Sequence, residues 1–392
     1  MGKEEQLKPY TARGTDAPWY RGWNISEEER ERFRKISRES REAKARALAG
    51  LCDDPKHPIP TPHLNPLELM PELEPNGLRA LSLFSGCGGL DLGFDRAGYK
   101  HVASFDILSE TGEVLSTARP NWVVFSGAEG DVTQINWSRY RGQVDVVHGG
   151  PPCQPFSQAG SRSGAEDVRD MIPHFADAVL KIRPRAFVCE NVLGLTSKKF
   201  QGYVQENIFD RLKSYHILQF RLEASHFGVP HRRRRVLFVG FRRRSDAERF
   251  LEPQATHDPN GSADIDLPPT MGVRKALGLS DIGFDSISPT LRSGWTGPRN
   301  TTSIVNSAAA VKSWGELGVW PHGVARDRQA ASAFVAKNGH YRLSIQDCML
   351  LQGFPEDWPI EPPVYKALGL IGNSVSPPMG YAVAKAVATA LC

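Results

Sequence analysis

The stretch Ala80-Leu81-Ser82-Leu83-Phe84-Ser85-Gly86-Cys87-Gly88-Gly89 decides the fold. Its apolar first half predicts a buried strand, and its glycines predict a tight turn. A helix is expected over Leu90 to Ala97, ended by Gly98. Strand, glycine turn and helix open a doubly wound α/β sheet, in which ligands lie at the carboxyl ends of the strands. The nicotinamide fingerprint needs a further glycine at position 91, and the aspartate found there disfavours that cofactor.

Two further strands, expected at 102–105 and 122–125, are each followed by an acid. Asp106 closes the first strand, where a carboxylate is placed to accept hydrogen bonds from ribose hydroxyls. Asp131 follows the second and suits an adenine amino group. For either aspartate alone, a turn or capping role is an equally good interpretation. Together with the glycine turn, the two acids indicate a nucleoside-bearing cofactor.

A cysteine between prolines follows the fourth expected strand, Val144-Asp145-Val146-Val147, in the stretch Gly149-Gly150-Pro151-Pro152-Cys153-Gln154-Pro155-Phe156-Ser157. Prolines on both sides stiffen the turn and would aim a nucleophile; the alternative is a buried structural cysteine. The next strand, 186–189, ends in Glu190, which is either a solvated loop residue or part of the site. We expect these two strands to be neighbours, so that Cys153 and Glu190 face one crevice as a coherent catalytic pair.

An arginine run, His231-Arg232-Arg233-Arg234-Arg235, enters an apolar strand at Val236. Strand alternation predicts Arg233 and Arg235 on one face and Arg232 and Arg234 on the other. One face then points into the crevice, and the other meets phosphate or solvent. A second cluster at 242–244 strengthens the electrostatic footprint of a nucleic-acid partner.

Composition bounds the class of protein. The chain has 392 residues, 40% of them hydrophobic and 23% charged, with a net charge of +4, as expected of a soluble globular protein. Its six cysteines have no CxxC spacing, which argues against a zinc site or a disulfide framework and for a reducing cytoplasm. We find no signal peptide and no apolar run long enough to cross a membrane.

Outside the sheet the organisation is less regular. Residues 1–77 read as an extension: a charged helix between Ser26 and Gly50, then a proline-rich linker on the domain surface. The helix is either a solvated surface helix or a contact with the DNA backbone or a partner. From 246 to 340 the α/β rhythm fades, which fits a recognition module or any loop-rich insertion. Order returns with a helical ending to 342–353 and a helix over 379–391.

Six motifs in this order make the chain resemble the bacterial DNA cytosine-5 methyltransferases from about residue 79 to 392. They are Phe84-Ser85-Gly86-Cys87-Gly88-Gly89, Pro151-Pro152-Cys153-Gln154-Pro155-Phe156-Ser157, Glu190-Asn191-Val192, the arginine strand at 230–236, Leu351-Gln352-Gly353-Phe354-Pro355 and Gly372-Asn373-Ser374-Val375. The resemblance implies a doubly wound, Rossmann-like S-adenosylmethionine-dependent methyltransferase sheet formed by residues 78–245 and 363–392. It also implies a smaller, loop-rich target recognition domain at 246–362.

The implied reaction is methylation of carbon 5 of a flipped-out cytosine in a specific duplex DNA sequence. Cys153 would be the nucleophile that forms a transient adduct, Glu190 would contact the pairing edge of the base, and Arg235, supported by Arg233, would face it. S-adenosyl-L-methionine is the implied cofactor. Its binding residues would be Phe84, Gly86, Gly88, Gly89, Leu90, Asp106, Ile107, Asp131, Val132, Pro152, Asn373 and Val375.

The implied partner is double-stranded DNA, with no metal and no membrane. Thr290-Leu291 is the expected recognition loop, and nearby Arg292 and Arg299 are suited to reading guanine edges, or else they bind only phosphate. The full set of expected DNA contacts is Gln154, Ser157, Arg232, Arg234, Thr290, Leu291, Arg292 and Arg299. Partner proteins of a restriction–modification or defence system are possible companions in a prokaryotic cytoplasm, near the nucleoid.

Three positions depart from the family pattern, and none removes a catalytic group. Asp106 replaces a glutamate, His231 a glutamine, and Ala159 a small polar residue. Two alternatives stay open. A tRNA cytosine-5 methyltransferase shares the motifs, although the long segment before Leu351-Gln352-Gly353 favours DNA. A catalytically silent DNA-binding relative is disfavoured by the intact Cys153 and Glu190.

Overall fold

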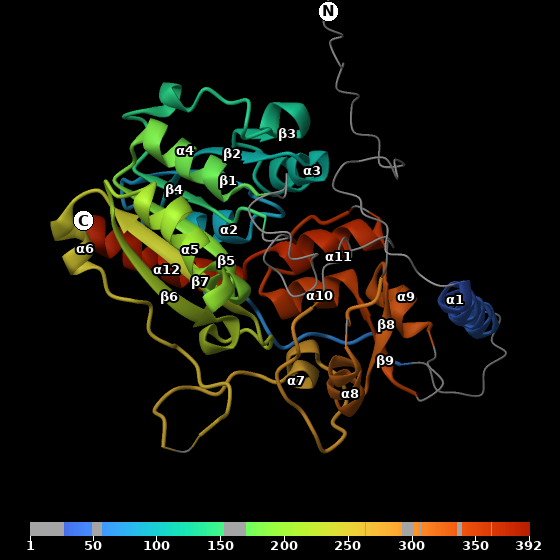
Figure 1. Cartoon of the computed structure of the whole chain (residues 1–392). Coiled ribbons are helices and arrows are strands. Elements are labelled where there is room, and N and C mark those ends of the chain that lie inside the picture. The colour runs from blue at the N-terminus through green and yellow to red at the C-terminus, as the bar shows by residue number, and fades with distance from the viewer. Residues whose placement is uncertain are drawn as a thin grey trace, which may run out of the picture.

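A seven-stranded sheet organises the larger part of the molecule (Figure 1). The computed structural model describes residues 27–48, 57–152, 170–262, 264–291, 302–305, 307–334, 339–361 and 363–392. The strand order is β3-β2-β1-β4-β5-β7-β6, with β7 antiparallel to both of its neighbours and the other pairs parallel. This arrangement confirms the predicted doubly wound α/β fold. The strands are β1 (Arg79–Leu83), β2 (Lys100–Asp106), β3 (Val124–Ser126), β4 (Val146–Gly149), β5 (Ala186–Val192), β6 (His216–Glu223) and β7 (Arg234–Phe241).

Helices cover both faces of this sheet (Figure 1). In β1 the side chain of Ala80 belongs to the cluster that includes α2 (Gly89–Arg96) and α12 (Pro377–Leu391). Leu81 and Leu83 belong instead to the cluster of α4 (Ile172–Ile182). The alternation of a strand therefore feeds two cores, one on each face. The remaining helices of this part are α3 (Ser109–Ala118), α5 (Gln201–Val204), α6 (Arg244–Arg249) and α11 (Val364–Asn373).

One strand boundary differs from the sequence prediction. The third strand begins at Val124, two residues later than expected, and the Trp122 ring before it stacks on His101 with their centroids 4.3 Å apart. The helical ending expected for 342–353 is confirmed as α10 (Ile345–Gln352), which follows the strand β9 (Tyr341–Ser344). A capping box sets the start of α10, because the Ser344 side chain accepts from the Asp347 amide while Asp347 accepts from the Ser344 amide.

The smaller part of the molecule has a packed interior. Its further elements are α7 (Val273–Leu277), α8 (Ala308–Glu316), β8 (Val319–Ala325) and α9 (Arg328–Ser332), with β8 pairing in parallel with β9. Trp314, Val319 and Tyr341 are buried in the same hydrophobic cluster as Ala80 of the large sheet. The expected irregular strands and loops of residues 246–340 thus include an ordered core, and this core continues into that of the sheet.

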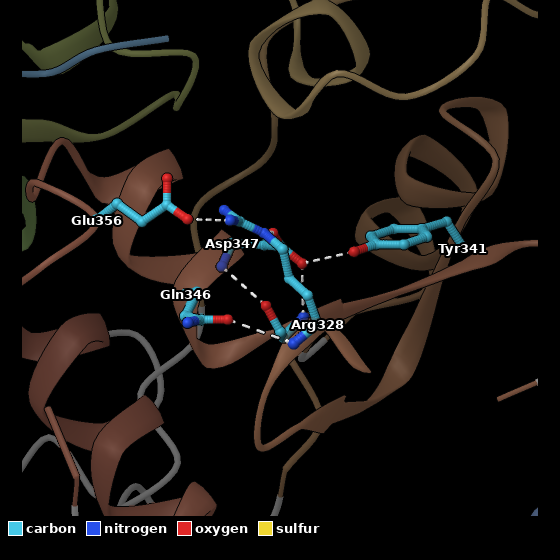
Figure 2. A network of polar contacts seen from close by, with 6 residues as sticks. Arg328, Tyr341, Gln346, Asp347 and Glu356 are labelled. Carbon is cyan, nitrogen blue, oxygen red and sulfur yellow. Dashed lines mark hydrogen bonds and ion pairs between the residues drawn. The ribbon is translucent and has the colours of Figure 1, made fainter. Parts of the chain in front are cut away.

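A buried polar network fixes α9, β9 and α10 to one another (Figure 2). The Arg328 guanidinium donates to Asp347, with Nε 2.8 Å from Oδ1, and it also contacts the Glu356 carboxylate. The Tyr341 hydroxyl donates to the other oxygen of Asp347 at 2.9 Å, and the Arg328 amide donates to Gln346. Because Asp347 is fully buried, its charge needs these donors. The network therefore holds α10 in place.

Residues 57–77, which we call the N-terminal strap, differ from the surface linker that we expected. Met70 is fully buried and Leu64 nearly so. Toward the sheet, the Tyr381 hydroxyl of α12 donates to the Pro71 carbonyl at 2.7 Å. Toward the smaller part, the strap's backbone amides at 63 and 64 donate to the Ala276 carbonyl of α7. A single proline, Pro66, lies between Leu64 and Met70, and prolines are frequent along the whole strap. This composition, without a helical or strand period, predicted a linker.

The charged helix predicted near the N-terminus is confirmed as α1 (Glu27–Leu48), and most of its described side chains are exposed. None of the helices in the described part of the chain is both long and apolar enough to cross a bilayer. The same residues contain no group of three or more His, Cys, Asp or Glu side chains arranged to hold a metal ion.

Candidate active site

The glycine turn after β1 has an unusual backbone. Phe84 has a φ of +55°, in the left-handed region that a bulky residue rarely adopts, and such strain concentrates at functional sites. Gly86 has a φ of +54°, and an added Cβ there would meet no atom within 4 Å. The space over Gly86 is therefore open to a ligand, at the carboxyl end of β1.

The last motif of the chain lies directly against this turn. A Cβ added to Gly89 would lie 2.0 Å from the Val375 carbonyl oxygen and 2.3 Å from the Ser374 Oγ. Only glycine permits that approach, which explains why the glycine turn and Gly372-Asn373-Ser374-Val375 occur in one protein. Asn373 is exposed and Val375 is buried. Two segments expected to bind the cofactor are thus brought together from opposite ends of the chain.

Asp106 connects the ends of β1 and β2. Its Oδ2 accepts from the Gly86 amide at 2.8 Å, and its Oδ1 accepts from the Leu108 amide at 2.9 Å. Burial raises the pKa of Asp106, and the two amides oppose that rise. The Asp106 carboxylate is therefore fixed at the turn that follows β1.

The residues that follow β2 and β3 form the sides of the same edge. Ile107, directly after Asp106, is 58% exposed although it is apolar. Asp131 accepts from the amide and the hydroxyl of Thr133, and the neighbouring Val132 is buried. An exposed isoleucine beside fixed carboxylates suits a ligand with both an apolar ring and hydroxyl groups.

The cysteine loop begins beside Glu190. Strands β4 and β5 are parallel neighbours, with Gly149 opposite Cys189, as the sequence predicted. The Asn191 side chain donates to the Pro151 carbonyl at 3.2 Å. A Cβ added to Gly150 would lie 2.7 Å from Glu190 Oε2, so the chain passes close to that carboxylate. Pro152 is half-buried, while Cys153, Gln154 and Ser157 lie outside the described residues.

Glu190 and Arg235 form a buried ion pair, in which Arg235 Nε is 2.6 Å from Glu190 Oε1. Only 8% of the Glu190 side chain and 11% of the Arg235 side chain are exposed. Burial raises the pKa of Glu190, against the opposing positive charges of Arg235 and Arg233. The site therefore holds a carboxyl that accepts a proton more readily than it would in water, beside a fixed cation.

The arginine run alternates as predicted. Arg233 is fully buried and Arg235 mostly so, on the face toward Glu190, whereas Arg232 and Arg234 are exposed. Arg234 approaches Glu223 on β6, with Nε 4.0 Å from Oε2. The arginines of the buried face thus place positive charge beside the Glu190 carboxylate. Those of the exposed face are available to solvent or to a phosphate backbone.

The expected recognition loop is anchored on the arginine run. The Thr290 hydroxyl donates to the Arg232 carbonyl at 2.6 Å, and the Leu291 amide donates to the His231 ring at 2.8 Å. The Thr290 side chain is exposed, but Leu291 is only 1% exposed. Leu291 therefore holds the loop in this conformation and offers no surface of its own. Arg292 and Arg299 lie outside the described residues.

Some residues that build the site were missed by the sequence prediction. Trp358 donates to the Cys87 carbonyl at 2.9 Å and so fixes the glycine turn, and nothing in the sequence around it signals this role. Asn191 holds the start of the cysteine loop, and its position directly after Glu190 was a usable signal. Gln352 donates to the Ser374 carbonyl at 2.7 Å, which joins two motifs that were recognised separately.

Comparisons with known proteins agree with this geometry. The family model described as C-5 cytosine-specific DNA methylase matches residues 78–389. Type II methyltransferase M.NgoMIV of Neisseria gonorrhoeae is 31% identical over 334 residues, which cover 80% of this chain and 97% of the relative. Type II methyltransferase M.Eco47II of Escherichia coli is 30% identical over 352 residues, covering 80% of this chain and 79% of the relative.

Solved structures show the same fold. A prophage-encoded protein of E. coli, described as a DNA modification methyltransferase, has a TM-score of 0.54 and 21% identity, covering 80% of this chain and 99% of its own. Spodoptera frugiperda DNMT2 has a TM-score of 0.51 and 18% identity, and the match covers 79% of this chain and 99% of DNMT2. The match of the family model over most of the chain, together with relatives at this identity, establishes that the chain belongs to the C-5 cytosine-specific DNA methylases and is a DNA (cytosine-5)-methyltransferase.

Proposed function

We propose that the chain methylates carbon 5 of a cytosine that has left the stack of a specific duplex DNA sequence, through a transient bond to Cys153. The observation that carries this proposal is the buried Glu190–Arg235 pair, 2.6 Å apart. It lies at the end of β5, beside the strand that leads into Pro151-Pro152-Cys153. An acid and a cation at one end of a sheet suit the two polar edges of a cytosine ring.

The nucleophile makes carbon 5 reactive. Carbon 5 of cytosine is too weak a nucleophile to accept a methyl group unaided. When the Cys153 thiolate forms a bond to carbon 6, the ring's double-bond electrons shift and carbon 5 becomes nucleophilic. Once carbon 5 carries the methyl group, a base removes its proton, the ring double bond re-forms and the thiolate leaves. An ordinary cysteine has a pKa of about 8.5 and is therefore mostly protonated at neutral pH. Nearby arginines would lower this pKa and so favour the thiolate.

Glu190 and Arg235 would stabilise the charge that forms on the ring. Because burial raises the pKa of Glu190, its carboxyl is suited to donate a proton toward ring nitrogen 3 as sulfur adds. Arg235 would then stabilise the carbonyl oxygen, and buried Arg233 adds positive charge behind it. These donors are fixed before the reaction, so they cost no reorganisation during it.

S-adenosyl-L-methionine fits the edge formed by β1, β2 and β3. The open space over Gly86, the fixed Asp106 carboxylate and the exposed Ile107 side chain are what its nucleoside requires. When bound, it supplies an electrophilic methyl group. We propose that it is held by the residues expected from the sequence, with Asp106 on the ribose and Asp131 near the adenine amino group.

Duplex DNA is the proposed substrate. A base inside the stack cannot reach Cys153, so the target cytosine must first leave the stack. Swinging it out costs a few kcal/mol, which contacts to phosphates and to neighbouring bases must offset. The exposed Arg232 and Arg234 are suited to phosphate, and we propose that residues 246–362, including Thr290, read the sequence. The names of the Type II relatives make a restriction–modification setting the proposed biological role.

Product analysis tests this function. DNA from cells that express the protein should contain 5-methylcytosine by nucleoside mass spectrometry. Bisulfite sequencing should place it in one short sequence. Methylation at another atom would refute the reaction, and methylation without any sequence preference would refute the recognition role.

A further inference from the structure

His231 lies where the arginine run meets the recognition segment. Its side chain is completely buried. The backbone on either side is paired with Ser288, since the Arg232 amide donates to the Ser288 carbonyl at 2.8 Å and the Ser288 amide donates to the Pro230 carbonyl at 2.9 Å. Residues 288–291 therefore lie along residues 230–232, directly before Arg233 and the strand β7, which carries Arg235.

One ring nitrogen of His231 is an obligatory acceptor. Its Nε2 lies 2.8 Å from the amide nitrogen of Leu291, and an amide N–H can only donate. The neutral ring must therefore carry its proton on Nδ1. Burial and the positive charges of Arg233 and Arg235 hold the pKa of His231 well below its ordinary value, so the ring stays neutral and Nε2 remains an acceptor.

The second ring nitrogen points to a partner on α10. The Gln352 side chain lies close enough to the His231 ring to raise its pKa, against the larger effect of burial. Among the described residues, His231 Nδ1 and Gln352 Oε1 are both buried polar atoms that make no hydrogen bond. One is a donor and the other an acceptor, so a hydrogen bond between them would satisfy both. Gln352 uses its amide group on Ser374, with Nε2 2.7 Å from the carbonyl oxygen.

Ser374 carries the connection to the cofactor turn. Its Oγ and the Val375 carbonyl oxygen are the atoms against which the backbone at Gly89 is packed. Of two neighbouring buried side chains, His231 thus accepts from the Leu291 amide, and Gln352 donates to the segment that abuts the glycine turn. The residues along this path are all buried: Ser374 is only 8% exposed and Leu291 only 1%, like the fully buried His231 and Gln352.

We propose that His231 and Gln352 are a buried positioning pair that sets the recognition segment, residues 288–291, against the arginine run and ties it to the cofactor turn. The inference rests on the proposed recognition role of that segment. Neither residue touches the reacting atoms. Their effect is on where the segment lies, and hence on DNA affinity and on discrimination between sequences.

Three variants separate positioning from mere stability. His231→Leu removes both the acceptor and the donor, which leaves the Leu291 amide buried without a partner and takes the Nδ1 donor away from the neighbourhood of Gln352 Oε1. His231→Gln restores one acceptor and one donor in a neutral side chain. Gln352→Met keeps the volume but breaks the pair from α10, together with the bond to Ser374. His216, exposed on the edge strand β6, is the matched control as His216→Leu.

The experiment measures kcat and KM on a duplex that contains the mapped site, and on duplexes with one base pair of the site changed. The Kd for S-adenosylmethionine is measured by calorimetry. For His231→Leu we expect about a tenfold rise in the KM for DNA, a comparable loss of discrimination and an unchanged cofactor Kd. His231→Gln and His216→Leu should stay within about threefold of wild type. Gln352→Met should raise both the KM for DNA and the cofactor Kd.

Two results would refute the proposed positioning role of His231 and Gln352. One is a folded His231→Leu variant that discriminates between the mapped site and the altered duplexes as well as wild type does. The other is a His231→Gln variant that is as impaired as His231→Leu. If His231→Leu does not fold, Gln352→Met and His231→Gln decide, because the pair predicts that the first is impaired and the second is not. Wild type that shows no sequence preference at all would refute the proposed recognition role itself, before any variant is compared.

Discussion

The Glu190–Arg235 pair is costly to bury, and this cost argues for its use. Both side chains are about nine-tenths buried, and removing two charges from water is only partly offset by their mutual attraction. A hydrophobic pair would fill the same space at less cost. Glu223 and Arg234, which are opposite each other in the β6–β7 ladder, make a more open contact at 4.0 Å. The two pairs therefore offer a comparison between a buried site and a surface contact of the same chemical type.

Glu190→Gln should lower kcat by about 100-fold and leave the Kd for S-adenosylmethionine within about twofold of wild type. Glutamine keeps the shape of the side chain but cannot transfer a proton or neutralise Arg235. Glu223→Gln is the matched control and should retain full turnover. Steady-state methylation of duplex DNA with a radiolabelled methyl donor measures the rates. An unchanged rate in Glu190→Gln would remove this residue from the chemistry.

Asp91 should give folding a pH dependence of its own. Its carboxylate accepts from Ser104 at 2.6 Å and from Ser82 at 3.0 Å, inside the core. Burial nevertheless raises the pKa of Asp91 from 3.8 to about 6. One pKa unit corresponds to about 1.36 kcal/mol, so ionising this group costs the folded state about 3 kcal/mol relative to the unfolded chain.

Because the folded-state pKa of Asp91 is raised, its favourable contribution is complete below pH 4 and is lost as the pH rises to about 6. Between pH 3 and 7 the free energy of unfolding of wild type should therefore fall by about 3 kcal/mol relative to Asp91→Asn. Urea denaturation at several pH values measures this difference, in which other titrating groups cancel. Parallel curves for the two proteins would show that Asp91 does not titrate there.

At the scale of elements, α2 and α12 pack at backbone distance. A Cβ added to Gly93 of α2 would lie 2.5 Å from the Tyr381 amide nitrogen and 2.7 Å from the Gly380 carbonyl carbon of α12. These are backbone atoms, so a side chain at position 93 can be accepted only if the helices separate. Since α2 carries the glycine turn at its start, this contact also positions the cofactor edge.

Gly93→Ala should therefore destabilise the fold by about 1–3 kcal/mol, the usual cost of overpacking. Gly202→Ala in α5 is the control, since an added Cβ there meets nothing within 4 Å and alanine favours a helix. The free energies of unfolding in urea give both values. Equal stability of Gly93→Ala and wild type would mean that the helices separate without cost.

The regular elements could be predicted from the sequence because their signals are local. The strand periods at β1, β2 and β5 and the alternation of the arginine run are written in consecutive residues. Contacts between distant segments could not be predicted in the same way. The approach of Val375 to Gly89 joins the two ends of the chain, and the bond from Trp358 to the Cys87 carbonyl spans 271 positions. Neither leaves a periodic pattern.

At the scale of the whole molecule, the N-terminal strap joins the sheet to the smaller part. It lies between α12 and α7 (Figure 1). The Pro71 carbonyl of the strap accepts from Tyr381 of α12, and backbone amides of the strap donate to the Ala276 carbonyl of α7. The strap also contacts α2, where Arg96 donates to the Met70 carbonyl at 2.9 Å. The hydrophobic cluster that it covers runs through both parts. The strap is thus part of the folded core.

Deleting residues 1–76 should destabilise the protein by more than about 3 kcal/mol, since burying a leucine or methionine contributes about 1.5–3 kcal/mol each. Leu64 and Met70 would both be lost. Deleting only residues 1–56 leaves the strap in place and should change the free energy of unfolding by less than about 1 kcal/mol. Thermal and urea unfolding of the two truncated proteins compare them. Equal stability would assign the strap no share in the core.

The central claim is that Cys153 forms a covalent bond to the target base beside Glu190 and Arg235. Its most direct test mixes the protein and S-adenosylmethionine with duplex DNA in which 5-fluorocytosine replaces the target cytosine, because fluorine at carbon 5 blocks the release of the cysteine. Denaturing electrophoresis and peptide mass spectrometry should find one adduct, attached at Cys153. Cys153→Ala should form none, and it should not methylate DNA although it still binds it. Turnover by Cys153→Ala, or the absence of an adduct with the wild-type protein, would contradict the account.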